Sequence, residues 1–388
     1  MTRKLHLIGF AALLAAALAP VRAQQIGKYV PIDAGSEADR AMKEINAAAD
    51  PAAKLALIDK FAAGPGAQGD MAIVADDLYV NYYLSQKNYD KAFEYGDKLA
   101  ALDPDNFNNA VNLTRAAAEK GDSEKLAAYG DKAGAILQRF KAAPPPADTE
   151  SGKWETEKKR VLDANHDLIA YAEQLVYNGA YQTTDPAKRA ALLVRFAKAF
   201  PDSAYAVPAM GVAATAYQQA QDTPKMLEVA DGLLAKDPNN LGMLLLLSDY
   251  YGEKGEQLAK AEEFAKKAVG LADTAPKPDG VPDDQWNREK TLQKGLALSA
   301  LGQINLQKKD NAQAVQNFVA AAPLLKGNEA SYGRNQYRLG FAYLNLKKTA
   351  EARAAFSEAA AAKGPYQTLA QEKLKSLPAA PSRRRRAS

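Results

Sequence analysis

Tyr95-Gly96-Asp97-Lys98 recurs further along the chain as Tyr129-Gly130-Asp131-Lys132. Both tetrapeptides lie in segments with the apolar spacing of an amphipathic helix, residues 88–102 and 122–136. The period, about 34 residues, is typical of a helix pair that cannot bury its apolar face alone and therefore stacks on copies of itself. We therefore predict an all-α array of stacked helix pairs, which indicates a binding scaffold.

Composition fits one soluble, well-packed array. The chain has 388 residues, of which 47% are hydrophobic and 25% are charged. A stacked array adds core with each repeat, so this length does not require separate domains, and we predict one solenoid over residues 36–377. Cysteine is absent, which excludes disulfides, thiolate nucleophiles and a lipid-modified cysteine.

Residues 1–23 have the pattern of a signal peptide. Arg3 and Lys4 precede an apolar run over residues 5–19, and Val21-Arg22-Ala23 places small residues where a signal peptidase cleaves. We expect cleavage after Ala23, by the general secretory route. No later stretch is apolar for long enough to span a membrane. We expect an exported protein, in a bacterial periplasm or secreted, without a transmembrane segment.

The net charge of +4 resides at the two ends of the chain. Three basic residues belong to the signal peptide and four arginines form residues 383–386. Without them, basic residues no longer outnumber the 46 acidic ones. A nucleic-acid-binding protein concentrates positive charge on its folded surface, so we do not expect a nucleic-acid partner. The arginine run lies in a tail, residues 378–388, that has no core-forming residues.

Near the C-terminus the spacing of small and aromatic residues resembles a known family. Leu339-Gly340, Tyr343, Ala352 and Phe356 follow the spacing of tetratricopeptide repeats. Leu301-Gly302 opens the same pattern one repeat earlier. Glycine is expected where two helices approach closely, with the phenylalanine filling the space beside it, whereas Gly69 is expected in a loop that tolerates a side chain.

The resemblance extends over residues 36–365 and implies a right-handed superhelical solenoid of about eight helix pairs. Asp103-Pro104-Asp105-Asn106 and Asp237-Pro238-Asn239-Asn240 match the turn between repeats, in which proline stops one helix and aspartate or asparagine caps the next. Residues 24–35 are predicted to be extended, and residues 366–377 to form a capping helix. The expected repeats are residues 36–66, 71–104, 105–141, 153–201, 205–238, 239–272, 286–324 and 332–365.

A longer period overlies the short one. Asp50-Pro51 returns as Asp185-Pro186, and Trp154 returns as Trp286 after nearly the same interval. A block of three repeats therefore occurs twice. Each tryptophan is expected to open a long helix, the first of them over residues 154–177.

Catalytic and metal-binding patterns are weak. His166 is the one histidine outside the signal peptide, and it is expected to be a packed or half-exposed structural side chain. Residues 64–69 spell a phosphate-binding glycine pattern, but helical segments flank them where such a loop requires a strand. Paired carboxylates such as Asp76 and Asp77 are interpreted as a solvated helix face. We predict no enzyme activity, no metal and no cofactor.

The resemblance places partner binding on the first helices of the repeats, which line a concave surface. Asn81 with Asn112 resembles part of a family clamp for a C-terminal carboxylate, although Asp77 stands where that clamp has a lysine. On residues 334–341, two guanidinium groups and two rings are expected on one side of a helix, suited to an acidic peptide. The alternative is that these are ordinary packed or solvated residues. The candidates are Asp77, Asn81, Asn112, Arg115, Arg334, Tyr337, Arg338 and Phe341.

The function favoured by the sequence is a non-catalytic scaffold of the bacterial cell envelope that binds a protein or peptide. One alternative is an assembly factor for outer-membrane or secretion machinery. An envelope hydrolase would need a nucleophile or metal site, for which the sequence gives no pattern. The sequence specifies neither the partner nor the oligomeric state.

Overall fold

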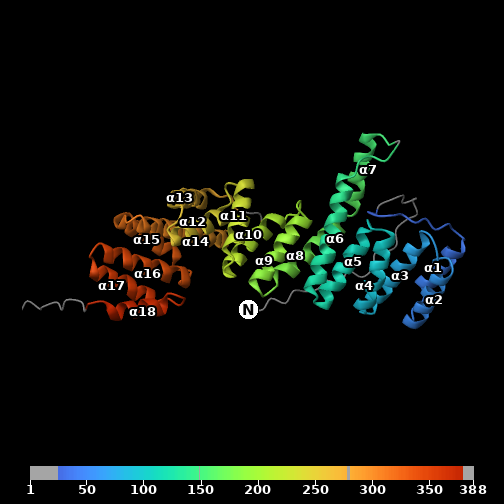
Figure 1. Cartoon of the computed structure of the whole chain (residues 1–388), viewed down its shortest axis with the longest axis horizontal. Helices are drawn as coiled ribbons and strands as arrows, with labels where there is room; N and C mark the ends of the chain where they lie inside the picture. The colour runs from blue at the N-terminus through green and yellow to red at the C-terminus, as the bar shows by residue number, and fades with distance from the viewer. Residues whose placement is uncertain (1–24, 148, 278–279, 379–388) are drawn as a thin grey trace, which may run out of the picture. The chain divides into compact units, whose positions relative to one another are not determined.

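The structure is a computed structural model that describes residues 25–147, 149–277 and 280–378 (Figure 1). Every regular element in these residues is a helix, so the predicted all-α class is confirmed. The chain divides into two compact units. Unit 1 contains the described residues up to Thr183 together with Arg195–Ala206, and unit 2 contains Thr184–Val194 and the described residues from Val207 onward.

Most consecutive helices pack on one another in both units, as expected for stacked helix pairs. The helices of unit 1 are α1 (Glu37–Ala47), α2 (Pro51–Ala63), α3 (Met71–Ser85), α4 (Tyr89–Leu102), α5 (Phe107–Lys120), α6 (Ser123–Ala142), α7 (Ser151–Ala164) and α8 (His166–Tyr181). Residues of both units occur in α9 (Pro186–Ala199) and α10 (Ala206–Gln219). The helices of unit 2 are α11 (Thr223–Lys236), α12 (Leu241–Lys254), α13 (Leu258–Thr274), α14 (Asp283–Gln307), α15 (Asn311–Leu325), α16 (Glu329–Asn345), α17 (Thr349–Ala361) and α18 (Gln367–Ser376).

The repeated tetrapeptide lies where one helix pair meets the next. Asp97 of the first copy accepts a hydrogen bond from the Tyr129 hydroxyl at 3.2 Å and pairs with Lys132 at 3.3 Å, both from the second copy. A Cβ atom on Gly130 would lie 2.6 Å from a methyl group of Val176 on α8. The tetrapeptide recurs because its glycine permits close helix approach and its aspartate links successive repeats.

The expected close approach at the C-terminal glycines is confirmed. A Cβ on Gly340 would lie 2.6 Å from two ring carbons of Phe356, and a Cβ on Gly302 would lie 2.6 Å from ring carbons of Phe318. Both phenylalanines are fully buried. Each ring therefore occupies the space that a larger residue at the glycine would need.

The two turns with the Asp-Pro-x-Asn pattern connect α4 to α5 and α11 to α12. Asn106 accepts a hydrogen bond from the Asn109 backbone N–H at 2.9 Å, and Asn240 accepts one from the Met243 N–H at 3.2 Å. Each side chain satisfies a donor that the first turn of a helix leaves without a partner. The predicted helix caps are thus confirmed at both turns.

The single helix predicted over residues 154–177 is wrong, because the helix is interrupted at Asn165. The Asn165 side-chain amide donates to the backbone carbonyl of Val161 at 2.8 Å, and Asn165 separates α7 from α8. Asparagine side chains compete with the backbone for such bonds, which disfavours a continuous helix. At the equivalent position of the second block stands Ala297, fully buried within the continuous helix α14.

The chain ends were also assigned from the sequence. The signal peptide and its cleavage site lie outside the described residues, as does the tail after Pro378. Residues 28–33 contain no helix, in line with the extended segment expected there, and α18 occupies the predicted capping position. Within residues 25–147, 149–277 and 280–378, no helix is both long and apolar enough to cross a membrane.

Candidate partner-binding face

On α3, the two predicted residues Asp77 and Asn81 are one helical turn apart and interact. The Asn81 amide donates to the Asp77 backbone carbonyl at 2.9 Å and to its carboxylate at 3.0 Å. Asn81 is exposed, whereas Asp77 is only partly exposed. Burial raises the pKa of Asp77 to about 6, against the opposing hydrogen bond from Asn81. Asp77 is therefore not the fully solvated carboxylate that was expected.

The other two predicted residues of unit 1 lie on α5, which contacts both α3 and α8. Asn112 and Arg115 are partly exposed and one turn apart. The Arg115 Nε atom lies 3.9 Å from a carboxylate oxygen of Glu119, which also accepts a hydrogen bond from the Tyr89 hydroxyl at 3.0 Å. This long ion pair on a single helix leaves the Arg115 side chain 37% exposed, although its Nε atom is buried without a hydrogen-bond partner.

Helix α8 adds a tyrosine that the sequence analysis did not single out. Tyr171 is 40% exposed. Burial raises the pKa of Tyr171, while the charge of nearby Arg115 opposes that rise. Only the packing of α5 on α8 reveals that this ring lies near the guanidinium. We define the α3–α5–α8 face as Asp77, Asn81, Asn112, Arg115 and Tyr171.

The predicted arginines of unit 2 are held in ion pairs. Arg334 of α16 lies 2.8 Å from a carboxylate oxygen of Asp249 on α12, and Arg338 lies 3.5 Å from the other oxygen. Arg338 also pairs with Glu253, and its side chain is only 5% exposed. The expectation of two guanidinium groups facing a bound peptide is therefore wrong, because both point at another repeat.

The electrostatics of this cluster favour the charged forms. Burial alone would raise the pKa of Asp249, but the charges and hydrogen bonds of Arg334 and Arg338 lower it below its ordinary value. Helix α14 contacts both α12 and α16, so the ion pairs connect helices on its two sides. The cluster links repeats within unit 2.

Tyr337 and Phe341 face a different helix from the arginines. Both rings pack edge-to-face on Phe356 of α17, with centroid distances of 5.6 and 5.3 Å, and Tyr337 also contacts Tyr366 beside α18. The expectation that rings and guanidinium groups share one side of α16 is thus wrong. The same two turns of α16 reach α12 through the arginines and α17 through the rings.

The structure also places the residues considered for chemistry. His166 is exposed, with its Nδ1 atom 3.2 Å from the Asp167 carboxylate, and is not the packed or half-exposed side chain that was expected. Residues 64–69 form a loop between helices α2 and α3, as predicted. In the part of the chain that the structure describes, no three His, Asp or Glu side chains gather as metal ligands would.

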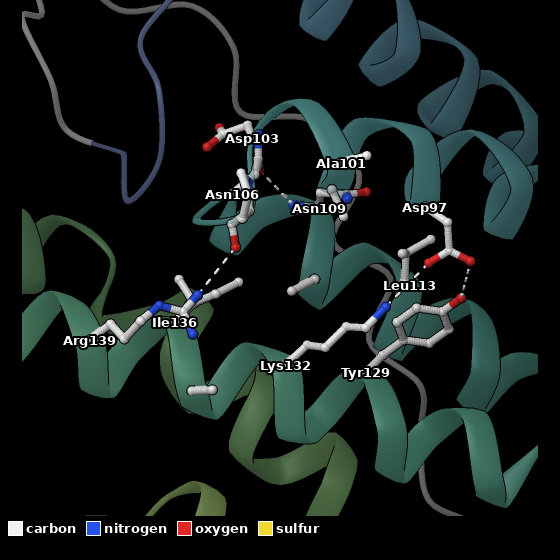
Figure 2. Close-up of a pocket in the computed structure, with 14 residues that line it drawn as sticks. Asp97, Ala101, Asp103, Asn106, Asn109, Leu113, Tyr129, Lys132, Ile136 and Arg139 are labelled. Atoms are coloured by element: carbon white, nitrogen blue, oxygen red, sulfur yellow. Dashed lines mark hydrogen bonds and ion pairs between the residues drawn. The ribbon is translucent and has the colours of Figure 1, made fainter.

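A pocket of about 420 Å³ lies between α4, α5 and α6 (Figure 2). Leu113, Ile136 and several alanines form its apolar part. Asp97 is bonded to Tyr129 and Lys132 on one side, and Arg139 pairs with Asp105 at 2.7 Å on the other. The polar groups around this pocket already hold the repeats together, so it is a weaker candidate than the α3–α5–α8 face.

Comparison with known proteins identifies the repeat. The tetratricopeptide-repeat family matches residues 333–364, which include most of α16 and all of α17. No curated protein matches the sequence significantly. The structure is similar to yeast Tom70, with 11% identity, a TM-score of 0.37 and coverage of 90% of this chain and 66% of that one. The chain thus spans slightly less than two thirds of the Tom70 structure.

Two further solved structures are similar over most of both chains. NprR in complex with its cognate peptide NprX has 15% identity and a TM-score of 0.31, covering 87% of this chain and 80% of that one. The P58(IPK) TPR domain has 14% identity and a TM-score of 0.28, covering 88% and 97% respectively.

The stacked helix pairs and the matched repeat define the class: the chain is a helical-repeat scaffold. More specifically, residues 333–364 match the tetratricopeptide-repeat family. Solenoids of this class typically provide extended surfaces for binding other proteins, without catalysis.

Proposed function

We propose that the chain is an exported scaffold that binds a protein or peptide partner through the α3–α5–α8 face. The observation that carries the proposal is the accessibility of Arg115. Its equivalent in unit 2 is Asp249, which follows Arg115 after the interval that relates the two blocks. Asp249 is held in the ion-pair cluster with Arg334 and Arg338. Arg115 has a single long contact to Glu119 on its own helix.

The chemistry of this face suits a polypeptide. Asn81 and Asn112 offer amide donors and acceptors, which pair with a peptide backbone. The exposed part of the Arg115 guanidinium offers charged N–H donors for a carboxylate or a backbone carbonyl, and Tyr171 adds an aromatic surface. Asp77, with its raised pKa, accepts a bond from a cationic or N–H donor of the partner.

Variants of this face test the proposal. Asn112→Ala with Arg115→Ala should reduce partner capture from an envelope fraction by at least tenfold, because two central contacts are lost. The matched control is Glu94→Ala with Lys98→Ala, which removes an exposed 2.9 Å ion pair from α4. Circular dichroism should be unchanged for both variants. Equal capture by the two double variants would exclude the α3–α5–α8 face.

The export part of the proposal rests on the leader sequence alone. Protein isolated from the envelope fraction should begin at Gln24, because Val21-Arg22-Ala23 forms the cleavage site. N-terminal sequencing measures this directly. A chain that retains Met1 in the cytosol would refute export. It would not affect the proposal for the α3–α5–α8 face, which the double variants test separately.

A further inference from the structure

The N-terminal strap, residues 25–28, is bound to the α4–α5 turn of its own chain. Ile26 is 3% exposed. The Phe107 backbone N–H donates to the Ile26 carbonyl at 3.0 Å, and the Lys28 N–H donates to the Asp103 carboxylate at 2.9 Å. Under this strap, Asp103 is 2% exposed and Phe107 is fully buried. A short segment that bends at Gly27 therefore fills a site made by the turn and the first residue of α5.

Gly27 shows what this site requires of its occupant. A Cβ atom there would lie 2.9 Å from an Asp103 carboxylate oxygen and 3.0 Å from the Asn106 Cα atom, and the φ angle is +126°. Both the contact and the backbone angle exclude larger residues. The site takes a large apolar residue directly followed by glycine.

The α11–α12 turn of unit 2 has the same backbone. Asp103 has φ −135° and ψ 84°, and Asp237 has φ −130° and ψ 90°. Asn106 has φ −73° and ψ 93°, and Asn240 has φ −63° and ψ 96°. In both turns the aspartate N–H donates at 2.8 Å to a leucine carbonyl one helical turn earlier. The block duplication has thus copied the turn that holds the strap.

This second turn is open. Asp237 is exposed and Leu241 is partly exposed, whereas their counterparts Asp103 and Phe107 are buried under the strap. Leu241 is the first residue of α12, as Phe107 is of α5, so its N–H projects from the start of the helix. The Asp237 carboxylate accepts one hydrogen bond, at 3.0 Å, from the backbone N–H of Asn239 in the same turn. Further acceptor positions remain on this carboxylate.

We propose that the α11–α12 turn is a second docking site, for a short segment of a partner protein that carries a large apolar residue directly before a glycine at which the segment bends. The carbonyl of the apolar residue accepts from the Leu241 N–H, and the N–H after the glycine donates to Asp237. The strap bound in unit 1 is the template for this geometry. The site shares no residue with the α3–α5–α8 face, so an experiment can refute either proposal and leave the other standing.

Calorimetric titration with a peptide of residues 25–33 tests the proposal on the chain from Gln24 to Ser388. The wild-type chain should bind one peptide, because the strap occupies the other site. A Gly27→Val chain should bind two peptides, because its strap can no longer occupy the α4–α5 turn. A Gly27→Val peptide should bind to neither turn.

Leu241→Pro identifies the site in unit 2. Proline at the first helical position keeps the helix but removes the N–H. When Leu241→Pro is the only change in the chain, the affinity for the peptide should therefore fall by at least about tenfold. Ser123→Pro makes the same change at the start of α6 and should leave binding intact. If Leu241→Pro loses helicity, Asp237→Ala serves in its place. The proposal is overturned if the wild-type chain binds no peptide, or if binding survives Leu241→Pro or its substitute.

Discussion

At the scale of single residues, Gly340 determines how closely α16 approaches α17. The side chain of Gly340→Ala would lie 2.6 Å from ring atoms of Phe356. We expect Gly340→Ala to lower the free energy of unfolding by about 1–3 kcal/mol through overpacking, although alanine favours helix. Gly232→Ala in α11 has no atom within 4 Å and should instead stabilise by about 0.5–1 kcal/mol. Urea unfolding measures both, and the same sign for the two would refute the packing argument.

The raised pKa of Asp77 predicts that the stability of the fold depends on pH. Its pKa is about 6 in the folded chain against an ordinary value of 3.8, so ionisation opposes folding. The wild-type chain should therefore lose stability as pH rises from about 4 to about 7, relative to Asp77→Asn, which carries no charge. Melting temperatures of the two chains measure this. A difference that stays constant from pH 4 to pH 7 would contradict the burial of Asp77.

Residue-level properties were only partly predictable. Gly340 follows from the family spacing because the aromatic partner belongs to the same motif. Gly69 was expected to tolerate a side chain, and no atom lies near it. Its φ of +60°, however, strains any larger residue, which corrects that expectation. A loop pattern does not specify the sign of φ at each glycine.

At the scale of elements, buried charge links α12 to α16. Arg338→Ala should lower the free energy of unfolding by about 3 kcal/mol, because it removes a buried guanidinium and leaves the half-buried Asp249 with one partner fewer. Arg334→Ala should cost less, since that side chain is 25% exposed and water can replace it. Denaturant titration compares the two. A larger loss for Arg334→Ala would refute the assigned burial.

The same cluster gives unit 2 an acid sensitivity. The pKa of Asp249 is lowered below 3.8, so its ionised form stabilises the fold above that pH. This contribution disappears as pH falls below about 3.8 towards the lowered value. Arg338→Ala should therefore show a smaller loss of stability on acidification than the wild-type chain.

Periodicity predicted the helix pairs but not which way their side chains point. The repeat spacing placed α3 to α6 and α16 to α17 because each pair carries its own apolar pattern. Asp249 stands 85 residues before Arg334, so no local pattern announces their pairing. Asn165 interrupts a helix through its own side-chain bond, in a segment whose apolar spacing continues on both sides.

At the scale of the whole molecule, one duplicated block has acquired two different surfaces. Arg115 and Glu119 correspond to Asp249 and Glu253 of the second block. The acidic pair is held by α16, whereas the Arg115 guanidinium stays accessible on α5. The sequence had also placed an acidic-peptide site on residues 334–341. We propose the α3–α5–α8 face instead, because exposed or partly exposed polar side chains remain there.

Site-specific photo-crosslinking tests this account most directly. A crosslinking amino acid at Asn112 should give discrete adducts with an envelope protein, because that position lies at the centre of the α3–α5–α8 face. The same amino acid at Ala128, exposed on α6, is the matched control and should give no such adduct. Adding Arg115→Ala should remove the Asn112 adduct while helicity stays unchanged. Adducts from Ala128 but not from Asn112 would contradict the central claim.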